Sequence, residues 1–153
     1  MQVRAARVTD VPEIQRLVNE YAGQGVMLPR SLQSIYGQLR DHQVMVDGDR
    51  ILGCVALSIV WEDLAEIRSL AVAPDAQSRG IGHALVERML TEARELGIRR
   101  VFVLTFVEGF FVDLGFVPVE KSELPHKIWQ ECVNCVHFPD CDEVALVLDL
   151  AGR

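Results

Sequence analysis

The segment from Gln77 to Gly82, with the sequence QSRGIG, has the residue types of an anion-binding turn. Its glycines let a ligand approach the backbone closely, and the first N–H groups of a following helix have no partner within that helix. The positive end of the helix dipole and the charge of Arg79 add to those donors, so the turn suits a phosphate group. An ordinary tight turn between a strand and a helix would use the same residues, and both interpretations stay open at this point.

A second candidate for chemistry is the carboxylate of Glu66, which could accept a proton or simply be solvated at a strand edge. Arg68 could pair with Glu66 or hold a substrate carboxylate through two parallel hydrogen bonds. In an extended chain Glu66, Arg68 and Leu70 lie on one face, with Glu66 about 13 Å from Leu70. Action of Glu66 through a water molecule is therefore more credible than direct contact.

These residues sit in one strand, turn and helix unit. The apolar run from Ile67 to Val72 is typical of a strand, and Ala73-Pro74-Asp75 ends it. After the turn, apolar residues recur at helical spacing at Ile81, Leu85, Met89, Leu90, Ala93 and Leu96. The unit carries neither a Gly-x-Gly-x-x-Gly dinucleotide fingerprint nor the Lys-Ser/Thr ending of a nucleotide-binding loop.

The remaining pattern predicts a mixed α/β sheet with helices on both sides. The expected strands are 2–6, 44–46, 51–60, a strand beginning near 65 and ending at 72, 101–104 and 144–150. The expected helices start at Thr9-Asp10, after the capping residue Ser31, at the Gln77–Gly82 turn and at Glu108. The first of them carries an apolar stripe for core packing, and so does the second: Ile14, Leu17, Val18 and Tyr21, and Leu32, Ile35, Tyr36 and Leu39. Asp47 to Arg50 is a hairpin signal between two strands.

The composition of the chain limits the classes of function that it can have. The chain has 153 residues, half of them apolar, which suits one domain with a sizeable core. The net charge of −7 and the dispersed Lys and Arg argue against a nucleic-acid surface. Anions must then be bound locally, which draws attention to Arg30, Arg68 and Arg79, although an arginine in the position of Arg30 is usually just solvated.

The N-terminus and the cysteines predict a cytoplasmic protein. The first ten residues lack the apolar core of a signal peptide, and no run approaches the ~18 apolar residues of a membrane span. The chain has four cysteines, and Cys54 stands in an apolar strand where it is expected to be core. The segment holding Cys132, Cys135, His137 and Cys141 could bind structural zinc, form a redox cluster or bury small apolar thiols. No metal ligand is assigned.

The turn resembles the pyrophosphate loop of the GCN5-related N-acetyltransferases (GNATs), Gln/Arg-x-x-Gly-x-Gly/Ala, at Gln77, Gly80 and Gly82. Within that family the chain is similar to the acetyltransferase domain of bacterial N-acetylglutamate synthases, in the short form that lacks a kinase-like domain. The closer likeness rests on residues 28–31, 53–57, 66–74, 103–105 and the pattern FFxxxGF at 110–116.

The resemblance implies one GNAT domain over residues 1–153, whose mostly antiparallel sheet has splayed fourth and fifth strands. The pantetheine arm of acetyl-CoA would pair with free backbone groups of Leu70, Ala71 and Val72, and the Leu70 N–H would stabilise the oxyanion, a contact worth about 2.7–4 kcal/mol. The family's phosphate loop maps onto Gln77, Ser78, Arg79, Gly80, Ile81, Gly82 and His83.

The resemblance also implies an acceptor, the α-amino group of L-glutamate, acetylated in the first step of arginine biosynthesis. Glu66 matches the proposed base and Arg30 an arginine of the substrate pocket, while Thr105 could contact ligand or only local backbone. Phe111 replaces the tyrosine that many relatives use as general acid. The final strand, reading Cys141-Asp142-Glu143, lacks the Arg and Ser that grip glutamate in the long synthases, so Lys127, Arg68 or backbone donors would have to replace them.

Two other functions stay open. The acceptor could be another small amine or a protein amine. The chain could instead be a regulatory module that binds acetyl-CoA or metal and transfers nothing. We expect a small-molecule partner, no nucleic acid, no membrane and a possible homodimer.

Overall fold

The computed structural model describes residues 1–23, 30–124 and 143–152. Seven strands form one sheet in the order β1-β2-β3-β4-β5-β7-β6. Their bounds are β1 Gln2–Ala5, β2 His42–Asp47, β3 Arg50–Trp61, β4 Leu64–Val72, β5 Arg100–Thr105, β6 Val117–Val119 and β7 Val144–Asp149. The β4–β5 pair is parallel, and the other neighbouring pairs are antiparallel. The predicted mixed, mostly antiparallel sheet is confirmed.

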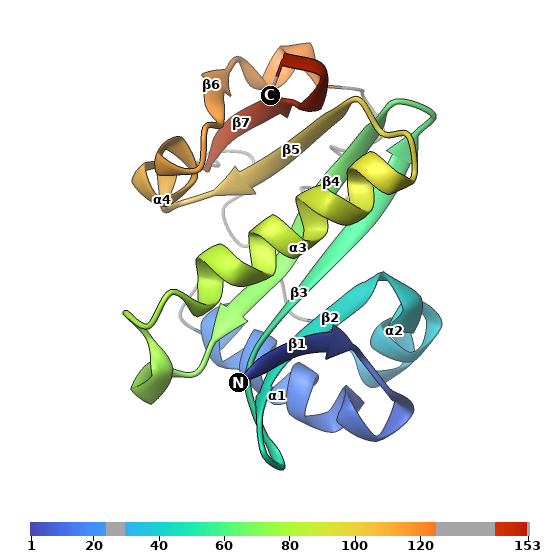
Figure 1. Cartoon of the computed structure of the whole chain (residues 1–153), viewed down its shortest axis with the longest axis vertical. Coiled ribbons are helices and arrows are strands. Elements are labelled where there is room, and N and C mark those ends of the chain that lie inside the picture. The colour runs from blue at the N-terminus through green and yellow to red at the C-terminus, as the bar shows by residue number, and fades with distance from the viewer. Residues whose placement is uncertain (24–29, 125–142, 153) are drawn as a thin grey trace.

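Helices cover both faces of this sheet. They are α1 Val11–Gly23, α2 Leu32–Gly37, α3 Ile81–Glu95 and α4 Glu108–Asp113. In Figure 1, α3 crosses the face of the sheet turned toward the viewer, and α1 and α2 lie on the far side. The apolar stripes predicted on α1 and α3 are buried, among them Ile14 and Leu17 on α1 and Leu85 and Met89 on α3. Burial of these stripes fixes both helices against the strands between them.

Two elements, α2 and β6, differ from the sequence prediction. Ser31 caps α2 as expected, because its hydroxyl oxygen accepts the Ser34 N–H at 3.0 Å. The helix then ends at Gly37, and Leu39 begins a short 3₁₀ turn instead of extending it. β6 was not predicted, because three residues containing Pro118 show no periodicity that could be recognised.

β1 is tied to the start of α1 by an ion pair. The carboxylate of Asp10 accepts two hydrogen bonds from the Arg4 guanidinium, at 2.7 and 3.0 Å, and one from the Arg7 N–H at 2.7 Å. The Asp10 side chain is only 8% exposed. Arg4, donating to that carboxylate, holds the Asp10 pKa below its usual value. This contact stabilises the entry into α1.

β4 and β5 separate along their length. Their ladder joins Leu64–Glu66 to Arg100–Phe102, and the described residues of β4 beyond Glu66 have no partner on β5. β4 nevertheless continues to Val72 and β5 to Thr105. The predicted splay of the two central strands is therefore confirmed, and it leaves one edge of β4 open.

A bulge interrupts β4 where the strands part. Arg68 lies opposite Ala56 and Ala71 opposite Cys54, so Ser69 and Leu70 together face one residue of β3. Ser69 has a φ of 54°, in the left-handed region that non-glycine residues seldom occupy. Glu66 and Arg68 share a face as predicted. Leu70 does not follow their alternation, so its placement on that face was wrong.

Among the described residues, no helix has both the length and the apolar character needed to cross a membrane.

Candidate active site

The N-terminus of α3 presents unpaired amides at an exposed turn. Gly80 caps the helix with a φ of 78°, and the first intrahelical bond runs from the Ala84 N–H to the Gly80 oxygen at 3.0 Å. The N–H groups of Ile81, Gly82 and His83 therefore precede the helical ladder. Ahead of them lie exposed residues with a second left-handed backbone at Ser78, φ 67°. The predicted phosphate-binding residues 77–83 are thus together at one helix end: Gln77, Ser78, Arg79, Gly80, Ile81, Gly82 and His83.

The two glycines of the turn are required for different reasons. A side chain at Gly80 would meet nothing within 4 Å, so its positive φ is what favours glycine there. A Cβ at Gly82 would lie 3.1 Å from Cζ of Phe110 in α4. The Phe110 ring also packs edge-on against His83, with centroids 5.1 Å apart. Gly82 therefore lets α4 approach the start of α3, a role that the sequence analysis did not foresee.

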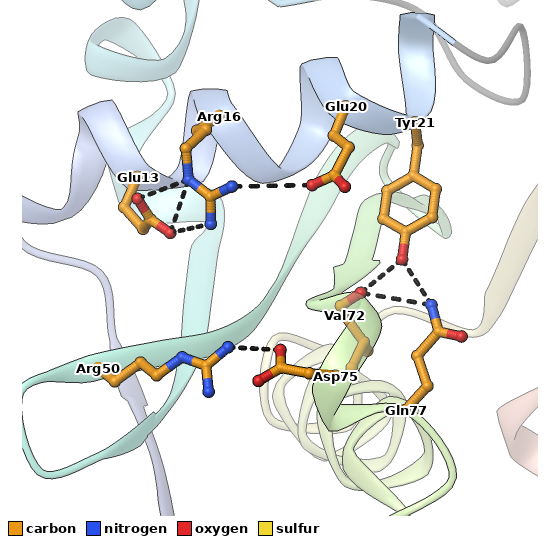
Figure 2. Close-up of polar contacts among 8 residues, drawn as sticks. All are labelled: Glu13, Arg16, Glu20, Tyr21, Arg50, Val72, Asp75 and Gln77. Atoms are coloured by element: carbon orange, nitrogen blue, oxygen red, sulfur yellow. Dashed lines mark hydrogen bonds and ion pairs between the residues drawn. The ribbon is translucent and has the colours of Figure 1, made fainter.

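Tyr21 of α1 links this turn to the end of β4 (Figure 2). Its hydroxyl donates to the Val72 carbonyl at 2.5 Å and accepts from Nε2 of Gln77 at 2.6 Å. The Gln77 amide also lies 3.5 Å from the same carbonyl. The expectation of a free Val72 carbonyl is therefore wrong, and a coenzyme pairing there would share that oxygen with Tyr21.

Glu66 and Arg68 form a largely buried ion pair on β4. Arg68 Nε lies 3.2 Å from Glu66 Oε1, and the side chains are 13% and 12% exposed. Burial raises the pKa of Glu66 to about 7, although the positive charges of Arg68 and Arg30 oppose that rise. A carboxylate with this pKa can both accept and release a proton near neutral pH.

Arg30 is positioned by two polar side chains of α1. The Asn19 amide accepts from the Arg30 N–H at 2.9 Å and donates to the Arg30 carbonyl at 3.2 Å. Gln15, one helical turn earlier, donates to the same carbonyl at 3.2 Å. Burial lowers the pKa of the Arg30 guanidinium, and the charge of Glu66 acts against that shift. Arg30 and Arg68 therefore bring two positive charges to one carboxylate.

Asp41 and His42 extend this polar cluster. Burial raises the Asp41 pKa, against the charges of His42 and Arg68. Burial lowers the pKa of His42, whose Nδ1 lies 2.8 Å from the Gln38 carbonyl oxygen. The sequence analysis missed both residues, as well as Gln15, Asn19 and Tyr21. The spacing of Gln15 and Asn19, four residues apart beside an apolar stripe, was the signal that could have found two of them.

Three other residues singled out from the sequence, Thr105, Phe111 and Cys54, make local or core contacts in the structure. Thr105 accepts a hydrogen bond from the Val107 N–H at 3.0 Å, so its oxygen serves local backbone. Phe111 is buried in the core and packs against Phe110 and Phe116. Cys54 is fully buried, and burial raises its thiol pKa to about 12, so it is an inert core residue as expected.

The late cysteine segment falls outside the described residues. Lys127, Cys132, Cys135, His137 and Cys141 all belong to 125–142. Within the described ranges, no group of three or more His, Cys, Asp or Glu side chains could hold a metal ion.

Comparison with known proteins identifies the family. The family model for "Acetyltransferase (GNAT) family" matches residues 14–116. An uncharacterised N-acetyltransferase of Chlorobaculum tepidum is 43% identical over 148 residues, covering 97% of this chain and 96% of that protein. An amino-acid acetyltransferase of Mycobacterium tuberculosis is 42% identical over 132 residues, covering 84% of this chain and 75% of that protein.

Solved structures agree with this assignment. A Mycobacterium tuberculosis protein in complex with CoA and NLQ has a TM-score of 0.83 at 36% identity, covering 97% of this chain and 99% of that one. The N-acetylglutamate synthase of Neisseria gonorrhoeae, complexed with coenzyme A and N-acetyl-glutamate, has a TM-score of 0.89 at 28% identity. The match covers 97% of this chain and 35% of the synthase. The chain belongs to the GNAT family of acetyltransferases, and it is an acyltransferase of that family.

Proposed function

We propose that this enzyme transfers the acetyl group of acetyl-CoA to the α-amino group of a small amino acid, L-glutamate, in the first step of arginine biosynthesis. The open edge of β4, the amides at the start of α3 and the Glu66–Arg68–Arg30 cluster support the proposal. So do the amino-acid acetyltransferase relatives and the neighbours complexed with coenzyme A.

The described residues fit acetyl-CoA at two places. The pyrophosphate would lie at the exposed turn, where the N–H groups of residues 81–83 and the charge of Arg79 are available. The pantetheine arm would lie along the edge of β4 that β5 leaves unpaired, near Leu70 and Ala71. Acetyl-CoA supplies the activated acetyl thioester, and the Leu70 N–H would donate to its carbonyl oxygen.

Glu66 would act as the general base. An α-amino group with a pKa of about 7.7–8 is mostly protonated at neutral pH, so it must lose a proton before it can attack. A Glu66 pKa of about 7 places its proton affinity close to that of the amine. Transfer of the proton to Glu66, directly or through one water molecule, would leave the nitrogen lone pair free to react.

Arg68 and Arg30 would bind the carboxylates of the acceptor. Their guanidinium groups are removed from water, which strengthens their attraction for an anion. The charges of Arg30 and Arg68 both act on Glu66, whose raised pKa keeps it partly neutral. Glu143 and Asp41 also act electrostatically on this cluster. The two positive charges beside a partly neutral carboxyl group are the observation that favours an acidic amino acid most directly.

A thiol-release assay with a panel of acceptors tests the proposal. The purified chain, given acetyl-CoA, is offered L-glutamate, L-glutamine, L-aspartate, L-leucine and a lysine-containing peptide. Release of free CoA thiol fastest with L-glutamate supports the proposal. Faster release with another compound moves the assignment to that amine. Coenzyme-dependent thermal stabilisation without thiol release from any acceptor would favour the regulatory module.

A further inference from the structure

Tyr21 connects three parts of the molecule, and no pattern in the sequence indicates that these parts are in contact. Its single hydroxyl donates to the last carbonyl of β4, at Val72, and accepts from the amide of Gln77 in the phosphate turn. Tyr21 itself belongs to α1 and packs partly buried against the core. α1, the end of β4 and the phosphate turn are therefore held at one oxygen atom (Figure 2).

Within the connection from Val72 to Gln77, Ala73 and Ala76 are buried in the core, and the Ala76 N–H donates to the Ala73 carbonyl at 2.9 Å. Ala73 N–H donates to the Leu52 carbonyl at 2.8 Å, and the Arg50–Asp75 ion pair is solvent-exposed on both sides. An exposed ion pair of this kind contributes little to order. Gln77 and the residues that follow it, up to Gly80, are exposed. Beyond the buried Ala76, the Tyr21 hydroxyl is a partly buried polar contact that holds Gln77 at the beginning of the phosphate turn.

We propose that Tyr21 is a positioning residue for coenzyme binding, acting through Gln77 and Val72. The inference rests on the proposed function, because the coenzyme must engage the β4 edge and the start of α3 together. The segment from Val72 to Gln77 sets the separation of those two places. A turn already held in place by Tyr21 loses less conformational freedom when ligand binds, so affinity is higher.

The test compares acetyl-CoA dissociation constants, measured by titration calorimetry, for the wild type, Tyr21→Phe, Gln77→Asn and the double variant. Tyr21→Phe keeps the ring and removes both hydrogen bonds. Each single variant is expected to weaken binding about 5- to 10-fold, the effect of one or two net hydrogen bonds. The double variant should be no weaker than the weaker single one, because both substitutions break the same link.

Tyr36 supplies the matched control. It is the other of the two tyrosines, lies on α2 and is 44% exposed. Tyr36→Phe should leave coenzyme affinity unchanged. A purely structural role for Tyr21 would instead lower the melting temperature of Tyr21→Phe while its affinity stays at the wild-type value.

The outcomes separate the two proposals. A wild-type chain that does not bind acetyl-CoA overturns both. A wild-type chain that binds acetyl-CoA, together with a Tyr21→Phe variant that binds it equally tightly or more tightly, overturns only the role of Tyr21. Additive losses in the double variant do the same.

In steady-state assays Tyr21→Phe should raise the KM for acetyl-CoA and leave kcat within about twofold. If Tyr21→Phe does not fold, unchanged affinity in Gln77→Asn, which shortens the amide and withdraws it from Tyr21, contradicts the proposal.

Discussion

Arg68 Nε lies 3.2 Å from Glu66 Oε1, and both side chains are mostly removed from water. Two opposing effects determine the pKa of Glu66. Burial favours the neutral carboxyl, and the guanidinium charge favours the carboxylate. The result is a pKa of about 7, whereas an exposed glutamate would stay ionised and be a weak base.

The first prediction concerns the pH dependence of turnover. Because Glu66 must be ionised to accept a proton, kcat should rise with pH through a midpoint near 7. Arg68→Met removes the positive charge that lowers the Glu66 pKa, so its midpoint should move to higher pH. Turnover is measured from about pH 5.5 to 9 at saturating acetyl-CoA. Arg94→Met on the exposed end of α3 serves as control, and a midpoint that moves down in Arg68→Met contradicts the electrostatic account.

The second prediction concerns Asn19, which holds the backbone of Arg30 through two hydrogen bonds. Asn19→Leu keeps the approximate shape of the side chain and removes both bonds. The KM for the amino-acid acceptor should rise about 5- to 10-fold, with kcat and coenzyme affinity little changed. Gln33→Leu, on the exposed side of α2, is the control. A change confined to the KM for acetyl-CoA would mean that Arg30 does not contact the acceptor.

The third prediction separates backbone strain from packing at the phosphate turn. Gly80→Ala forces a side chain into a φ of 78° and should destabilise the fold by about 1 kcal/mol in urea unfolding. Gly37→Ala also meets nothing within 4 Å but needs no positive φ, so it should be neutral or slightly stabilising. Equal effects of the two substitutions would show that the left-handed backbone at Gly80 is not required.

The fourth prediction concerns the Arg4–Asp10 pair. Asp10→Asn replaces the buried acceptor of three hydrogen bonds and should lower the free energy of unfolding by about 1–3 kcal/mol at neutral pH. Because the folded-state pKa of Asp10 lies below its unfolded value, this stability is present above the unfolded pKa. It is lost as pH falls through the folded pKa.

The difference between wild type and Asp10→Asn should therefore shrink in acid, as followed by urea unfolding at several pH values. Asp113→Asn, on an exposed position of α4, is the control. A difference that stays constant down to low pH would show that the charge of Asp10 does not contribute.

The helices followed from apolar periodicity, which is a property of the local sequence. The splay of β4 from β5 was expected only from the family likeness. The bulge at Ser69 and Leu70 was not predicted. A plain alternating pattern gives no sign that one residue is inserted, and Ser69 is not a glycine that would signal a positive φ. The face occupied by Leu70 could therefore be known only from the register with β3.

The candidate site was predicted in part. Glu66, Arg68 and Arg30 were named because their residue types suit the chemistry, and the structure brings Glu66 and Arg68 together. Tyr21 was interpreted as one more apolar position on α1, since nothing local shows that its hydroxyl reaches Gln77, 56 residues away. Long-range polar contacts of this kind depend on the tertiary packing of two elements, which a single sequence does not encode by spacing.

The most direct test is to measure N-acetyl-L-glutamate formation by mass spectrometry with the purified chain and with Glu66→Gln, and with Glu62→Gln as an exposed control. Wild type and Glu62→Gln should produce it from acetyl-CoA and L-glutamate at equal rates. Glu66→Gln should be slower by about 10²- to 10⁴-fold while binding acetyl-CoA normally. Product formed by Glu66→Gln at the wild-type rate, or no product from wild type, would contradict the account.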